Sequence, residues 1–186
     1  YFIDNDEYFP KKQMFDDLDG NFMINNDERM IFYCKGVIET VRKLGWAPDV
    51  IHCQGWFTSL VPMYIKTLYA EDPLFENVKV IYSVFDNSFD GLLSDTIADK
   101  LLYEKLEEKD VEGVKVPNIN NLHKFATDYA DAVVQASPEM DKEVLAHIKK
   151  SEKPFMEYPG EEDYIDAYQD FYSQFIEEEE VVTTED

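Results

Sequence analysis

The feature that most constrains the fold of this chain is a regular alternation between short apolar runs and longer amphipathic stretches. Three runs, at residues 49–54, 78–85 and 132–136, are short, apolar and not interrupted by regularly spaced polar residues. Between them, apolar residues recur at helical spacing. This alternation is typical of a parallel sheet with right-handed crossovers and helices on both faces. The chain is therefore predicted to be an α/β protein, half of a doubly wound, Rossmann-like architecture.

The first amphipathic stretch is the most clearly marked helix. It is expected to begin at Asn26 or Asp27, both good N-caps, and to carry an apolar stripe as far as Leu44. Gly45 can adopt the left-handed conformation that ends a helix, and Pro48 prevents continuation. Further helices are predicted over residues 57–69, 95–109, 121–129 and 138–149.

The two ends of the chain differ from its middle. Residues 164–175 carry an aromatic helical stripe, interpreted as a packing face rather than a ligand-binding box, and the last ten residues read as a solvated acidic tail or a partner-binding one. The predicted organisation is a domain over residues 1–148, a helical extension over 149–176 and an acidic tail over 177–186. Tyr1-Phe2-Ile3 reads as a β-strand entered partway, which indicates an N-terminally truncated fragment.

Charge excludes several classes of function. Seventeen Lys and Arg against forty Asp and Glu give a net charge of −23, which repels phosphate backbones and anionic lipid. Nucleic-acid and membrane partners are therefore not expected, and no apolar run approaches the ~20 residues of a membrane-spanning helix. Two cysteines, Cys34 and Cys53, are too few for a disulfide framework, so a cytoplasmic location is predicted.

Ligands of open α/β sheets bind outside the carboxyl ends of the strands, so the residues there are the candidates for a binding site. The substrate-binding candidates are His52, Gln54, Trp56, Ser83, Asp86 and Asn87. No phosphate-binding glycine loop and no G-x-S-x-G elbow is present, so no cofactor and no catalytic residue is assigned.

Three histidines are too far apart in the sequence to suggest a metal site. His123 and His147 are expected on helix surfaces, whereas His52 lies on a predicted buried strand. Two interpretations of His52 remain open: a hydrogen-bonded core histidine, or a ligand-binding group. Its neighbour Cys53 is interpreted as a small buried hydrophobic residue, since no nearby positive charge would lower its pKa.

Several collinear blocks make the sequence similar to a known family. The two longest blocks are residues 44–52 (LGWAPDVIH) and residues 128–133 (DYADAV). The first block is followed by Leu60-Val61-Pro62, and the second by Ser137-Pro138-Glu139-Met140. Shorter matches are Tyr1-Phe2-Ile3-Asp4-Asn5 and Asp27-Glu28-Arg29. Over residues 1–148 the chain resembles bacterial glycogen synthases and plant starch synthases.

The resemblance implies a fold and an activity. It implies the N-terminal, acceptor-side domain of a two-domain GT-B glycosyltransferase. Such enzymes transfer glucose from ADP-glucose or UDP-glucose to the 4-hydroxyl of an α-1,4-glucan, with retention and without a metal. The implied partners are α-glucan, nucleotide-glucose and a separate nucleotide-binding domain.

The family's first motif, H-x-H-D-W, is only partly present. His52 and Trp56 match its ends, Gln54 replaces the second histidine, and Gly55 replaces an aspartate that the family places at the reacting sugar.

The motif after the next strand, T-x-H-N-x-x-Y-Q-G, is altered as well. Ser83, Phe89 and Gly91 fit it, but Phe85 replaces a histidine used near the transferred glucose, and Asp86 replaces the asparagine. The family's K-x-G-G-L loop would lie upstream of residue 1.

Three hypotheses follow. The first is a glycogen- or starch-synthase-like glucosyltransferase domain that is not competent as this isolated chain. The second is a catalytically degenerate module that binds glucan or regulates a synthase. The third is a Rossmann-like domain whose ligand has diverged.

Overall fold

The computed structural model describes residues 5–9, 14–86, 89–103 and 105–176. The predicted strand at Tyr1-Phe2-Ile3 and the predicted acidic tail lie outside these ranges. Within them, four parallel strands form one sheet in the order β1-β2-β3-β4. The strands are β1 (Val50–Gln54), β2 (Lys79–Val84), β3 (Ala132–Gln135) and β4 (Phe155–Met156). The predicted α/β class with a parallel sheet is confirmed.

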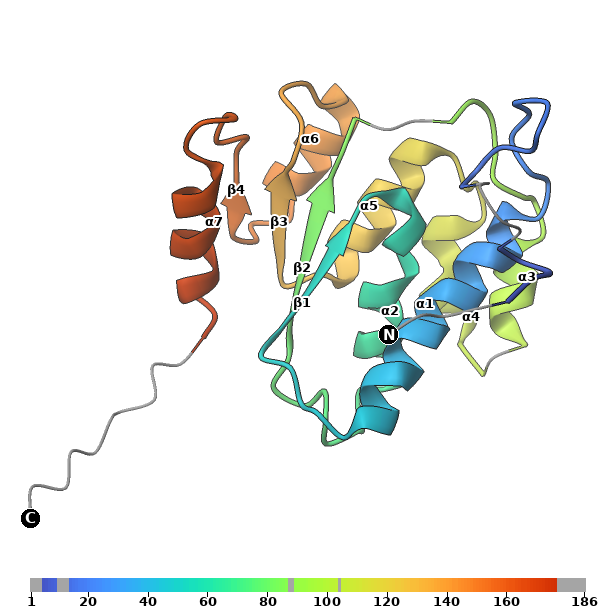
Figure 1. The fold of residues 1–186 in the computed structure, drawn as a ribbon, viewed down its shortest axis with the longest axis horizontal. Helices are drawn as coiled ribbons and strands as arrows, with labels where there is room; N and C mark the ends of the chain where they lie inside the picture. Colours follow the sequence, from blue (N-terminus) through green and yellow to red (C-terminus); the bar gives the residue numbers. More distant parts are fainter. Residues whose placement is uncertain (1–4, 10–13, 87–88, 104, 177–186) are drawn as a thin grey trace, which may run out of the picture.

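The larger core lies on one face of the sheet. Helices on this side include α1 (Asn26–Leu44), α2 (Leu60–Lys66), α5 (Ile119–Tyr129) and α6 (Lys142–Lys150), and Figure 1 shows α1, α2 and α5 beside the sheet. Val80, Tyr82 and Val84 of β2 point into this core because alternate residues of a strand face the same side. The rest of this layer consists of α3 (Ile97–Leu102), α4 (Glu108–Val111) and the 3₁₀ turns Trp56–Thr58 and Glu112–Val114.

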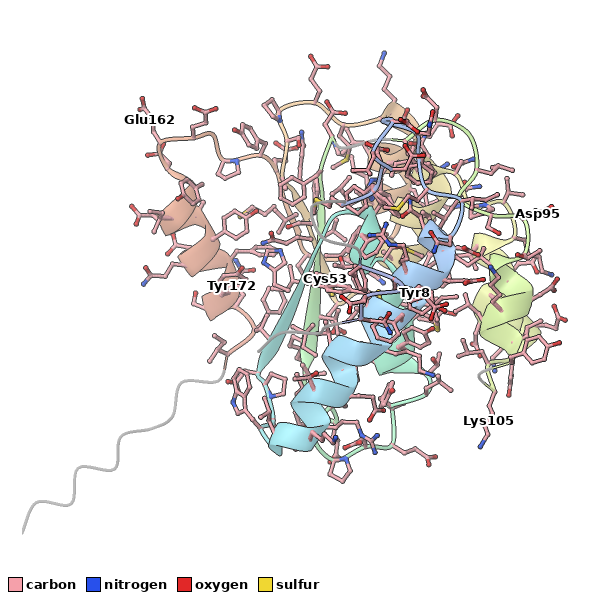
Figure 2. All side chains as sticks on the ribbon, turned by 45° about the vertical axis from the view of Figure 1, so that its right-hand side comes forward. Tyr8, Cys53, Asp95, Lys105, Glu162 and Tyr172 are labelled. Atoms are coloured by element: carbon pink, nitrogen blue, oxygen red, sulfur yellow. The ribbon has the colours of Figure 1, made fainter. Side chains whose placement is uncertain are left out.

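Of the helices in the described ranges, α7 (Tyr164–Ser173) packs against the opposite face. Phe171 is buried there against Ile81, Ala132 and Val134, which alternate with the strand residues of the larger core. The sheet therefore has helices on both faces, as predicted, and the aromatic stripe supplies the second layer. Figure 2 shows Tyr172 on the side of α7 that is turned toward the sheet.

The first helix matches its predicted range but not its predicted cap. Gly45 ends α1 with φ 64°, in the expected left-handed conformation. At the start of α1, however, Asn26 and Asp27 are buried inside the first turn instead of capping it. Asn26 donates to the Phe15 carbonyl at 2.8 Å, and Lys100 donates to Asp27 at 2.6 Å. Tertiary contacts therefore take up the side chains that were expected to cap the helix.

The predicted helix over residues 95–109 is broken into two pieces. Lys105 has φ 70°, a conformation that no helix interior accommodates, and it lies in the connection between α3 and α4. Glu107 and Asp110 then form a reciprocal capping box that starts α4. Helical periodicity continues across this connection, so the pattern alone does not show the break.

β4 was not predicted, because two residues carry no periodic signal. Its position is supported by Lys153, whose ammonium group donates to the carbonyls of Thr127, Asp128 and Ala130 at 2.6–2.7 Å. These carbonyls lie at and beyond the end of α5, where they lack helical partners. Lys153 thus holds the chain beside β3 just before β4 begins.

Candidate functional site at the strand ends beneath α7

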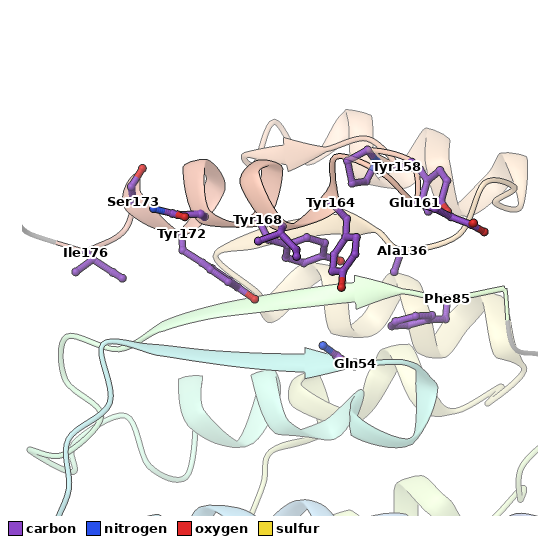
Figure 3. Close-up of a pocket in the computed structure, with 14 residues that line it drawn as sticks. Gln54, Phe85, Ala136, Tyr158, Glu161, Tyr164, Tyr168, Tyr172, Ser173 and Ile176 are labelled. Carbon is purple, nitrogen blue, oxygen red and sulfur yellow. The ribbon is translucent and has the colours of Figure 1, made fainter.

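An open cavity of about 920 Å³ lies between α7 and the carboxyl ends of the strands. Gln54 at the end of β1, Phe85 just after β2 and Ala136 just after β3 lie on one side of it (Figure 3). Tyr164, Tyr168 and Tyr172 of α7 lie on the other. The cavity falls where parallel α/β sheets bind ligands and is of the size of small-molecule sites.

A hydrogen-bonded cluster ties the helix to the sheet. The two ring nitrogens of His52 lie 2.6 Å from the Ser83 hydroxyl and 2.6 Å from the Tyr172 hydroxyl. Burial lowers the pKa of His52 to about 4, so its imidazole is neutral at pH 7. A neutral imidazole has one donor and one acceptor nitrogen, which matches two hydroxyl partners.

The Ser83–His52 pair resembles a nucleophile and its base, but its burial argues against that role. Ser83 has no exposed surface, so a substrate cannot reach its hydroxyl. No carboxylate orients the histidine; its second nitrogen meets Tyr172. Of the two interpretations of His52, the geometry favours the hydrogen-bonded histidine, which here positions Tyr172 at the cavity.

The other candidates occupy different surroundings. Gln54 is exposed and lines the cavity. Trp56 is 2% exposed and enclosed by the rings of Phe15, Phe57 and Phe89, so it is part of the core and not of the cavity wall.

Asp86 and Asn87 follow β2. Asp86 is exposed, and its backbone N–H donates to the Ser137 hydroxyl at 2.8 Å. Asn87 lies outside the described residues. Of the candidates, Gln54 lines the cavity directly. His52 and Ser83 lie behind the wall, where His52 contacts the lining residue Tyr172. Trp56 and Asp86 do not line the cavity.

The prediction that His123 lies on a helix surface is wrong. It is 3% exposed, and its Nδ1 atom lies 2.8 Å from the Tyr82 hydroxyl of β2. Burial lowers the pKa of His123 to about 4. The buried face of α5 therefore includes a polar residue as well as the apolar stripe. His123 can be buried there because the Tyr82 hydroxyl supplies a hydrogen-bonding partner inside the core. Cys53, by contrast, is buried as expected, and burial raises the pKa of its thiol.

Phe85 and Gly55, the two residues that replace expected catalytic side chains, have different positions in the structure. Phe85 lines the cavity, and its ring offers no conventional hydrogen bond to a ligand. Gly55 has φ 73° and ψ 172°, and its N–H donates to the Ser83 carbonyl at 3.0 Å. That backbone conformation is nearly exclusive to glycine.

Charge in the cavity is sparse. Among the described residues that line it, Glu161 is the single carboxylate, and none is Lys, Arg or His. Over the described part of the chain, no group of three metal-ligating side chains is assembled, and no helix is long and apolar enough to cross a bilayer. The site offers aromatic faces, amides and hydroxyls instead of cations.

The tyrosines of α7 are among several lining residues that the sequence does not mark as part of a site. Tyr164, Tyr168 and Tyr172 repeat every four residues, which is a signal for one helix face. It does not distinguish a face that packs from a face that packs and also borders a cavity.

The fold and site define one class of protein: a Rossmann-like parallel α/β domain that presents a ligand-sized cavity at its strand ends. Residues 1–153 match the starch synthase catalytic domain family, and the chain belongs to that family. The resemblance found in the sequence is thereby confirmed.

Curated relatives are glycogen synthases. The chain is 33% identical over 142 residues to that of Chlorobium phaeobacteroides, covering 72% of this chain and 29% of the relative. It is 32% identical over 153 residues to that of Chlorobaculum parvum, covering 81% of this chain and 30% of the relative. The chain thus spans less than a third of the length of these relatives.

A solved structure shows the same fold. The catalytic domain of starch synthase IV from Arabidopsis thaliana, bound to ADP and acarbose, superposes with a TM-score of 0.59 at 18% identity. The match covers 81% of this chain and 32% of the Arabidopsis chain. This domain therefore corresponds in fold to one part of a starch synthase catalytic domain.

Proposed function

We propose that this chain is an acceptor-side domain of the glycogen- and starch-synthase type, which handles α-1,4-glucan but does not by itself transfer glucose from a nucleotide sugar. Family membership supports the glucan setting. The Arabidopsis neighbour was solved with ADP and acarbose, which makes a nucleotide and a glucan-like molecule the ligands to test.

The observation that carries the second half of the proposal is the lining of the cavity. Transfer from a nucleotide sugar requires stabilisation of a departing diphosphate, and preorganised charge of this kind is among the largest catalytic contributions. The lining has no cation within the described ranges, Phe85 replaces the expected histidine, and Gly55 replaces the expected aspartate. A separate nucleotide-binding domain would have to supply the missing cations.

The direct test is a transfer assay on the 186-residue chain. With labelled ADP-glucose or UDP-glucose and glycogen as acceptor, we expect no incorporation above background, while the chain itself sediments with glycogen. The double variant Gly55→Asp/Phe85→His is expected to be equally inactive, because it restores two side chains but no cation. Incorporation by either isolated chain would contradict the proposal.

A non-catalytic role is the second candidate, and the aromatic and amide character of the cavity favours it. On this reading the chain binds glucan or regulates a synthase. The two candidates separate when the nucleotide-binding half of a glycogen synthase is added to the chain. Glucose transfer by the mixture supports the catalytic candidate, whereas glycogen binding without transfer supports the non-catalytic one.

Two further expectations from the sequence stay predictions. They are the division into a domain (1–148), a helical extension (149–176) and an acidic tail (177–186), and the cytoplasmic location.

A further inference from the structure

The chemistry of the cavity wall indicates what kind of molecule it can hold. Its aromatic rings come from Phe85, Tyr158, Tyr164, Tyr168 and Tyr172, and its polar groups include the amides of Gln54 and Gln169 and the hydroxyl of Ser173. Most of the accessible wall is apolar, and a few hydrogen-bonding groups belong to it. A suitable ligand has apolar faces and polar edges.

Charge narrows the choice of ligand. Nucleotides and sugar phosphates need cations or backbone N–H clusters to hold their phosphates. None of the lining residues that the structure describes carries a positive charge, Glu161 is negative, and the whole chain has a net charge of −23. A polyanion would be repelled, so the cavity is suited to an uncharged ligand.

The shape of the wall favours an extended ligand over a compact one. Tyr164, Tyr168 and Tyr172 follow one another along α7, and at 1.5 Å per residue their backbone positions extend over about 12 Å. Tyr164 is 50% exposed at one end of this row, and Ile176 is 46% exposed beyond the other. Tyr168 and Tyr172, between these two ends, are partly exposed, so the row offers several contact positions in succession, as a chain-like ligand requires.

Two of the three tyrosines, Tyr168 and Tyr172, are held in place before any ligand arrives. The Tyr172 hydroxyl lies 2.6 Å from His52, and the Tyr168 ring centroid lies 5.8 Å from that of His52. Phe171, on the adjacent side of the helix, is buried in the sheet. Such preorganisation lowers the entropy that binding would cost.

From these observations we propose that the cavity beneath α7 binds a neutral α-1,4-linked oligosaccharide, whose sugar faces stack on the α7 tyrosines and whose hydroxyls meet Gln54, Gln169 and Ser173. The choice of α-1,4-linked glucose rests on the proposed function; the neutral, chain-like character rests on the cavity. Because α7 lies beyond residue 153, these tyrosines are outside the part of the chain that matches the family.

Calorimetric titration of the 186-residue chain with maltohexaose tests the proposal. Tyr164→Ala removes a half-exposed ring of the wall and is expected to weaken binding about tenfold or more, which is the loss of one good contact. Gln169→Ala, also exposed, is expected to weaken it as well. Tyr103→Ala is the matched control, since Tyr103 is 91% exposed just after α3, on the far side of the molecule from α7.

The outcomes separate this proposal from the proposed function. Maltohexaose binding that is weakened in Tyr164→Ala and unchanged in Tyr103→Ala supports the cavity. If all three variants bind maltohexaose as tightly as the unaltered chain, the cavity is not the binding site, but the proposal that the chain handles α-1,4-glucan still stands. If ADP-glucose competes with maltohexaose, the site is not restricted to neutral ligands. If the chain sediments with glycogen but binds no maltohexaose, the cavity proposal is wrong while the proposed function is supported.

Discussion

Gly55 shows how a single backbone conformation limits what this site can contain. With φ 73° and ψ 172°, the residue occupies a region in which a Cβ atom is strained. Its N–H bonds to the Ser83 carbonyl, so the conformation is part of the turn that leads from β1 into the Trp56–Thr58 3₁₀ turn. The aspartate that the resemblance expects here cannot simply be put back into this backbone.

Gly55→Asp is accordingly expected to lower the free energy of unfolding by about 1–3 kcal/mol. Gly55→Ala should lose a similar amount, because the cost comes from the Cβ atom and not from the carboxylate. Urea denaturation of both variants measures the effect. Unchanged stability of Gly55→Ala would show that the turn relaxes freely and that the strain argument is wrong.

Between elements, the His52 cluster joins three parts of the fold. His52 lies on β1, Ser83 on β2 and Tyr172 on α7, so one short hydrogen bond joins two strands of the sheet and a second links the sheet to the helix of its second face. Together with Phe171 in its apolar contact, the His52–Tyr172 hydrogen bond fixes where α7 lies over the strands. The cavity exists because α7 covers β2 and β3 while leaving the strand ends open.

This arrangement predicts a pH dependence of stability. The pKa of His52 is lowered by burial from 6.5 to about 4, so between these values the unfolded chain binds a proton that the folded chain does not. Stability is therefore expected to fall as pH decreases from 6.5 toward 4. His52→Phe should reduce this slope without abolishing it, because His123 has the same lowered pKa.

Denaturation midpoints measured between pH 7 and pH 5 test this expectation. Tyr172→Phe is the matched control: it removes the hydrogen bond but keeps the histidine, and burial is the cause of the shift. Its pH slope should match that of the unaltered chain. An identical slope in His52→Phe would show that His52 is protonated as easily in the folded chain as in the unfolded one.

At the scale of the whole molecule, the dominant property is the net charge of −23. Several Lys and Arg residues are engaged in ion pairs, for example Lys66 with Asp131 at 2.7 Å and Arg42 with Asp72 at 2.7 Å. The excess carboxylates repel one another, and this repulsion is stronger in the compact state than in the unfolded chain.

Salt is therefore expected to stabilise the protein. Raising NaCl from 10 mM to 500 mM shortens the Debye length from about 30 Å to about 4 Å and screens most of the repulsion. The melting temperature should rise with NaCl, and NaCl should act alike in the presence and absence of maltohexaose. A falling melting temperature would indicate that the ion pairs outweigh the repulsion.

The sequence alone was sufficient for the class of fold, because short apolar runs and helical periodicity are local properties. It placed β1, β2, β3 and α1 close to their observed ranges and identified the family from blocks such as residues 44–52. It also located the strand ends as the place to search for a site, since parallel strands all end at one edge.

The composition of the site was decided by tertiary structure. Whether His123 faces solvent depends on Tyr82, forty-one residues earlier, and whether Trp56 can reach a ligand depends on Phe15 and Phe89. The α7 tyrosines become a cavity wall only when His52 and Phe171 hold that helix across the sheet. Periodicity records which residues share a face of an element, but the partner of that face is set by contacts between distant parts of the chain.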